Sequence, residues 1–156
     1  MADTTYLKKI VEPFVVDWVS SRLRVSFEPK RLPVGKNTES RWVHFAFDGV
    51  SEDGQIGLLV STSHTVKPGG TRKLHVDASI LLQAPFRRRI MAFVSHDVQQ
   101  NFINKCDGLL PLGNIEMLVC EELPPDMIRQ IEQVQAETKE EVGDKGKIWK
   151  PGGKRK

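Results

Sequence analysis

The chain has 156 residues, of which 39% are hydrophobic and 28% charged, and its net charge is +3. These values are typical of one globular domain and exclude wholesale disorder. The apolar runs are too short to span a bilayer, and the two cysteines, Cys106 and Cys120, are too few for a disulfide framework. Since the first residues also lack the pattern of a secretion signal, we expect a cytoplasmic protein that does not enter a membrane.

The first element in chain order is a predicted helix. Apolar residues recur every three or four positions from Leu7 to Val19, as one buried helix face requires. Pro13 interrupts this pattern, so either the helix bends there or it begins there with Pro13 in its first turn. A short strand at 24–27 follows, and then a loop at 29–37 that is marked by prolines, a glycine and an asparagine.

A β-hairpin is predicted next. Residues 41–50 alternate, with Val43, Phe45 and Phe47 on one face and His44, Ala46 and Asp48 on the other, which is typical of a strand. The more apolar segment 55–62 is its expected antiparallel partner, because the intervening residues Ser51–Gly54 have the composition of a tight turn.

The second half of the chain alternates helices with short apolar strands. Pro68–Thr71 is predicted to break the chain before a helix at 73–83. The continuous apolar runs at 88–95 and 115–120 predict inner strands of the same sheet. Further helices are expected at 97–106, where Ser95 is the cap, and from Pro124 to about Val142. This order predicts an α/β fold, a three-layer α/β/α sandwich with a mixed sheet.

Positive charge is concentrated at the C-terminus. Residues 143–156 contain six basic residues and one acid, so this segment carries +5 and the rest of the chain −2. We predict one domain over 1–142 and a flexible basic tail over 143–156. Such a tail is suited to holding phosphates by counterion release, and equally to acting as a solubilising terminus. Its candidate nucleic-acid contacts are Lys150, Lys154, Arg155 and Lys156.

Several familiar sites are absent from the sequence. Gly69-Gly70 lacks the lysine and the spacing of a phosphate-binding loop, and there is no Gly-x-Ser-x-Gly elbow. The four histidines show no metal-ligand spacing. Residues 61–64 (Ser-Thr-Ser-His) form a hydroxyl-rich strand end that is suited to phosphate, but their spacing gives no Ser–His–acid order.

The order of elements, with Glu12 on the opening helix and Asp48 near the end of the first hairpin strand, resembles the PD-(D/E)xK nuclease superfamily, the restriction-endonuclease-like fold, over about residues 6–123. In that family an Asp closes the first hairpin strand and a Glu-x-Lys triplet lies on the second. The resemblance implies that Asp48 is a ligand of Mg²⁺, and that Glu12 is the accessory acid. Two carboxylates there hold the ion, which neutralises phosphodiester charge and activates water.

The family triplet is missing from the second hairpin strand. It should fall near Leu59-Val60-Ser61, where there is neither a carboxylate nor a lysine. Lys73, at the start of the next predicted helix, is the candidate for a relocated catalytic lysine, and Lys67 is a poorer one. Asp48 and Glu12 also have structural explanations: an Asp suits a strand end before a turn, and a Glu suits a helix start.

A second basic cluster, Arg87-Arg88-Arg89, precedes a predicted core strand. It is a candidate contact for a nucleic-acid backbone and equally a solvated strand entrance. Trp42 is a candidate for stacking on a base, although aromatic residues beside strands usually pack.

Three functions are compatible with this pattern. The first is a nuclease-fold protein with a degenerate site that binds nucleic acid and cuts it weakly or not at all. The second is a protein-interaction or scaffold domain of the same fold. The third is an active Mg²⁺-dependent endonuclease that uses a relocated lysine.

Overall fold

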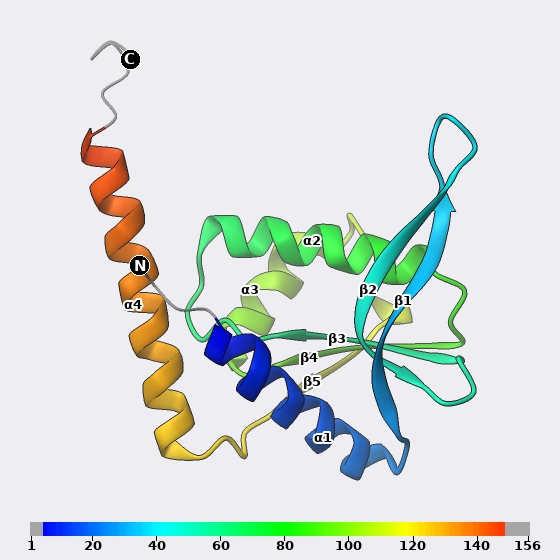
Figure 1. Cartoon of the computed structure of the whole chain (residues 1–156), viewed down its shortest axis with the longest axis horizontal. Coiled ribbons are helices and arrows are strands. Elements are labelled where there is room, and N and C mark those ends of the chain that lie inside the picture. Colours follow the sequence, from blue (N-terminus) through cyan, green and yellow to red (C-terminus); the bar gives the residue numbers. More distant parts are fainter. Residues whose placement is uncertain (1–4, 149–156) are drawn as a thin grey trace.

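The structure, a computed structural model, describes residues 5–148 and the side chains up to residue 137. Five strands form one mixed sheet in the order β1-β2-β3-β4-β5 (Figure 1). The strands are β1 (Phe27–Lys36), β2 (Trp42–Ser51), β3 (Ile56–Ser61), β4 (Arg88–Phe93) and β5 (Glu116–Val119). The first three pair antiparallel and the last three pair parallel. The predicted α/β class with a mixed sheet is therefore confirmed.

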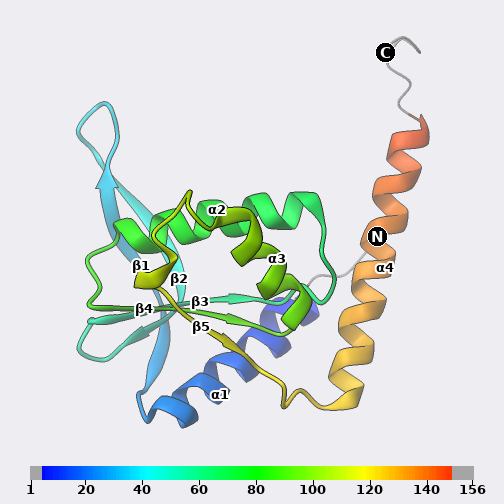
Figure 2. The ribbon, with the colours of Figure 1, turned by 180° about the vertical axis from the view of Figure 1, so that it is seen from behind.

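Four α-helices lie within residues 5–148: α1 (Glu12–Leu23), α2 (Pro68–Gln83), α3 (His96–Cys106) and α4 (Pro125–Ile148). They pack on both faces of the sheet, with α1 and the start of α4 on one face and α2 and α3 on the other (Figure 2). None of these helices has the length and apolar character needed to cross a membrane.

Each face of the sheet has its own apolar core. On the first face, Val15 and Val19 of α1 and Ile131 of α4 pack against Leu58 and Ile90. The second core is built by Leu74, Leu81 and Phe102 of the helices with Phe47 and Phe93 of the sheet. Because β4 contributes to both cores, it is an inner strand, as the continuous apolar run at 88–95 predicted.

The opening helix begins before Pro13. Residues 5–23 are helical without a break, because a π-helical turn (Leu7–Val11) leads directly into α1, and the backbone N–H of Glu12 donates to the carbonyl of Leu7. Pro13, which has no N–H, therefore follows a widened turn of a continuous helix. The helix ends at Arg24, whose left-handed backbone (φ 56°) reverses the chain. Pro13 lies in the first turn of α1, as one of the two alternatives has it, but that alternative is wrong about where the helix begins, since the helical segment already starts at residue 5.

The predicted loop at 29–37 was wrong, because these residues form most of β1. This strand lies at the edge of the sheet, where a proline that cannot donate a ladder hydrogen bond is tolerated. The pairing with β2 shifts register between Glu28 and Lys30, across Pro29, and again between Pro33 and Gly35. These irregularities let the prolines lie within an otherwise continuous strand. The expected hairpin of β2 and β3 is confirmed, although β2 pairs mainly with β1.

Two other predictions need correction. Pro68–Thr71 does not break the chain but forms the first turn of α2, because proline at the first helical position leaves no donor unpaired. The strand predicted at 115–120 is not an inner strand: β5 is the second edge of the sheet and is only partly buried. The cap at Ser95 is confirmed, since its hydroxyl accepts a hydrogen bond from the backbone N–H of Val98 at 3.3 Å.

The last helix is longer than predicted. It continues past Val142 to Ile148, so that residues 143–148 of the predicted flexible tail are helical. The segment before them, residues 131–142, is rich in glutamate and glutamine, which favour helix in spite of the glycines at 143 and 146. The rest of the predicted tail, residues 149–156, lies outside the described residues.

Candidate functional site

Asp48 lies where β2 and β3 separate. The last backbone-paired residues of these strands are Gly49 with Leu58, and the next donor of β3 is taken by a side chain: the backbone N–H of Val60 donates to Asp48 Oδ2 at 2.7 Å. Where the two strands diverge, the Asp48 carboxylate therefore accepts the hydrogen bond that a backbone carbonyl of a paired strand would otherwise accept from Val60. This bond has a structural role, and it also orients the carboxylate.

Glu12 and Asp48 are in side-chain contact. Burial, the Asp48 charge and a hydrogen bond to Asp48 raise the pKa of Glu12 to about 7, while Lys8 and Lys73 oppose the rise. Burial also raises the pKa of Asp48, against hydrogen bonds from Val60 and Glu12 and the charge of Lys73. Two carboxyls in contact cannot both ionise at low cost, so below about pH 7 they hold one proton, which Glu12 donates to Asp48.

Lys73 and Asp77 extend the cluster from α2. Their charges act on Asp48, and their side chains are joined by an ion pair of 2.9 Å between Lys73 Nζ and Asp77 Oδ2. The side chain of Lys73 is 76% exposed, whereas that of Asp77 is 15% exposed. The structure thus brings Glu12, Asp48 and Lys73 into one neighbourhood, with the lysine held by an acid that the sequence analysis did not select. The i,i+4 spacing of Lys73 and Asp77 was the available signal.

A pocket of about 290 Å³ opens beside the two carboxyls. Phe27, Pro29 and Ala46 line its apolar side, and Lys8 and Asp17 of the N-terminal helical segment complete its polar side. Lys8 was also missed in the sequence, although it stands four residues before Glu12, where the two side chains share a helix face. The pocket makes the carboxyl pair accessible to a ligand.

The second hairpin strand supplies no further carboxylate or ammonium to this site. Leu58 and Leu59 are buried in the two apolar cores, and Ser61, where the family lysine would stand, is half-buried. Lys67 precedes α2 and lines a small pocket with Ser63 and Thr71 instead.

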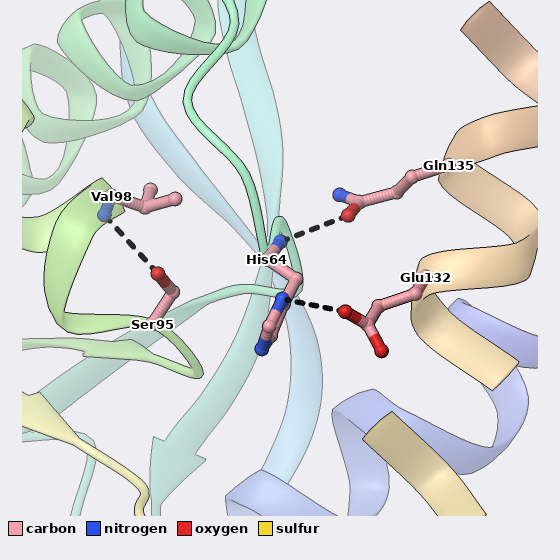
Figure 3. A network of polar contacts seen from close by, with 5 residues as sticks. All are labelled: His64, Ser95, Val98, Glu132 and Gln135. Carbon is pink, nitrogen blue, oxygen red and sulfur yellow. Dashed lines mark hydrogen bonds and ion pairs between the residues drawn. The ribbon is translucent and has the colours of Figure 1, made fainter. Parts of the chain in front are cut away.

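The hydroxyl-rich segment that follows β3 contacts α4 through His64. The backbone N–H of His64 donates to Gln135 Oε1 at 3.3 Å, and its ring Nδ1 lies 3.9 Å from Glu132 Oε2 (Figure 3). Within the described residues, no hydrogen bond joins Ser61, Thr62 or Ser63 to the His64 ring. This arrangement anchors a helix and does not activate a nucleophile.

The arginine triplet lies at the other end of the sheet from the carboxyls. Arg88 pairs in register with Ile56, the first residue of β3, whereas Asp48 contacts Val60. Arg88 makes a two-pronged ion pair with Glu116, with both N···O distances 2.8 Å, and Arg89 donates to the carbonyls of Leu81 and Ala84 at 2.9 Å each. Two of the three guanidinium groups are therefore engaged within the fold. The four tail residues selected as nucleic-acid contacts lie outside the described residues.

Within the part of the chain whose side chains are described, no three His, Cys, Asp or Glu residues gather as metal ligands. The sequence matches no protein-family model and no curated protein, and the structure matches no solved structure. The assignment of function therefore depends on the geometry of this chain alone.

Proposed function

We propose that this protein has the three-layer, restriction-endonuclease-like fold and binds nucleic acid beside a reduced phosphodiesterase site. The observation that carries the proposal is the contact of Glu12 with Asp48, at the strand divergence and beside an open pocket. In the PD-(D/E)xK layout the resemblance assigns an accessory acid and the first metal-binding acid to these two positions. Lys73 is the only lysine of α2 and supplies a positive charge near them.

The pair fits Mg²⁺ in its chemistry. Mg²⁺ prefers oxygen ligands and is commonly held by one or two carboxylates together with waters and substrate phosphates. Glu12 and Asp48 would hold it, and the ion would supply charge neutralisation of a phosphodiester and a more acidic water. Without a carboxylate on β3 the site has one protein ligand fewer than the family pattern, so we expect weak binding and little cleavage.

A divalent cation and the shared proton compete for the same carboxyls. Because the pKa of Glu12 is about 7, millimolar Mg²⁺ should raise the melting temperature more at pH 8 than at pH 6. Glu12→Gln should remove most of this shift and keep a donor for Asp48. Glu52→Gln, an exposed acid in the β2–β3 turn, is the matched control and should retain the shift. Equal shifts in the two variants would exclude the pair as the metal site.

Activity is tested by incubating plasmid DNA and RNA with the protein and Mg²⁺ or Mn²⁺. We expect little or no cleavage. Clear cutting that disappears in both Asp48→Asn and Lys73→Gln would instead establish an active endonuclease with a relocated lysine.

Nucleic-acid binding measurements distinguish the proposed function from the scaffold alternative. Titration of duplex and single-stranded DNA and RNA at two salt concentrations should give an affinity that falls with salt, because neutralised phosphates release counterions. Absence of binding to all four nucleic acids would favour a protein-interaction domain of the same fold.

A further inference from the structure

The hairpin of β1 and β2 projects beyond the rest of the sheet as an arm, residues 30–46 (Figures 1 and 2). Its charge is +3, whereas the other residues of 1–142 sum to −5. It contains four basic residues, Lys30, Arg31, Lys36 and Arg41, and one acid, Glu39. All four basic residues are exposed, and none of them forms an ion pair with another residue whose side chain is described.

One face of the arm is packed and the other is open. Phe45 and Phe47 of β2 contact each other and belong to the core under α2. Because successive side chains of a strand point to opposite faces, Trp42, His44, Ala46 and Asp48 share the face away from α2. Ala46 lines the pocket beside Glu12 and Asp48, so this open face continues into the candidate site.

The β1 partners on this face are basic. Arg31 pairs in register with Ala46, and Lys36 pairs with Trp42. Directly opposed residues of an antiparallel pair lie on the same face. The open face therefore carries a cation near the pocket and a second one at the tip of the arm.

Trp42 is the exposed aromatic residue of the tip. It is 59% exposed, and Lys36 Nζ lies 5.1 Å from its ring centroid. A base can stack on such an exposed ring while the neighbouring ammonium meets the adjacent phosphate.

We propose that the open face of the arm binds one strand of nucleic acid, with a base stacked on Trp42 and phosphates at Lys36 and Arg31, and directs that strand to the Glu12–Asp48 pocket. A single strand is favoured over a duplex because a paired base offers no free face to an indole ring. This inference rests on the proposed nucleic-acid binding and names the surface that performs it.

The test measures the affinity of the full chain for a fluorescent oligothymidine by anisotropy. Trp42→Ala should weaken binding about tenfold, since one stacked base contributes about 1–3 kcal/mol, and Trp42→Phe should recover part of the loss. Leu109→Ala, which changes a side chain that is 70% exposed after α3, is the matched control and should bind like the wild type.

Charge is tested separately. Arg31→Gln combined with Lys36→Gln should weaken binding and reduce the slope of log affinity against log salt by about 1.4, or roughly 0.7 for each phosphate of a single strand that is no longer neutralised. Arg72→Gln combined with Lys105→Gln removes the same charge from exposed positions of α2 and α3 and should leave the slope nearly unchanged. Melting temperatures show whether each variant is folded.

The outcomes separate the two proposals. Wild-type protein that binds no nucleic acid overturns both. Wild-type binding that the arm variants leave intact, but that truncation after Ile148 abolishes, overturns the arm and leaves nucleic-acid binding to the tail. Equal or tighter binding of duplex DNA, with Trp42→Ala unaffected, contradicts the stacked single strand.

Discussion

The charged side chains near the two ends of β3 are arranged in opposite ways: those at one end have partners of complementary charge or polarity, and those at the other end are two acids. At its start, beside β4, Arg88 and Arg89 are matched by Glu116 and by two helix carbonyls. At its end, Glu12 and Asp48 bring two acids together, and burial raises the pKa of Glu12 to about 7. The first end uses charge to hold elements together. The second keeps charge in an unfavourable arrangement beside a pocket, which is where a ligand would relieve it.

The largest loss of stability is expected from a substitution of Arg89, at the start of β4. Its guanidinium donates to the carbonyls of Leu81 and Ala84, which lie at the C-terminal end of α2. Arg89→Met keeps the aliphatic stem but leaves these acceptors without partners, so the free energy of unfolding should fall by about 2–3 kcal/mol. Urea denaturation measures the change. Arg87→Met, at an exposed position of the same triplet, is the control and should change stability by less than about 0.5 kcal/mol.

At the carboxyl end, the expected effect depends on pH. The pKa of Glu12 is about 7 in the fold against an ordinary 4.5, so between these values the folded state holds more protons than the unfolded state. The free energy of unfolding should therefore fall as pH rises from about 5 to about 8. Glu12→Gln should flatten this profile and exceed the wild type at pH 8 by about 1–2 kcal/mol, allowing for solvent screening. Parallel profiles would refute the shared proton.

The smallest effect is expected at the ion pair of Arg88 with Glu116. Both side chains are more than 40% exposed, at 42% and 46%, so water screens their attraction. The coupling energy in a double-mutant cycle of Arg88→Met and Glu116→Gln should be about 0.5–1 kcal/mol and should shrink in high salt. A coupling of several kcal/mol would mean that this pair, and not Arg89, secures the start of β4.

Sequence patterns predicted the elements that depend on local signals. The strand at 88–95 and the cap at Ser95 each follow from a few adjacent residues. β1 was missed because Pro29 and Pro33 are signals of a loop, and only an edge position with register shifts reconciles them with a strand. The start of α2 was missed because Pro-Gly-Gly has the composition of a turn, although proline also suits the first helical position.

The residues of the candidate site could be predicted from the sequence, but the contacts between them could not. Glu12, Asp48 and Lys73 were selected through a resemblance of layout. Their proximity depends on how α1 and α2 cross opposite faces of the sheet, which no local pattern encodes. The separation of the arginine triplet from the acids has the same origin, because it follows from strand register.

The prolines and register shifts of β1 also bear on self-association. An edge strand with a regular row of free backbone groups can add a strand from a second molecule and start aggregation. Pro29 and Pro33 have no N–H to offer, and the two irregularities interrupt the spacing that an incoming strand would need. We therefore expect the outer edge of β1 to be a poor template for an added strand, although the arm extends beyond the rest of the sheet.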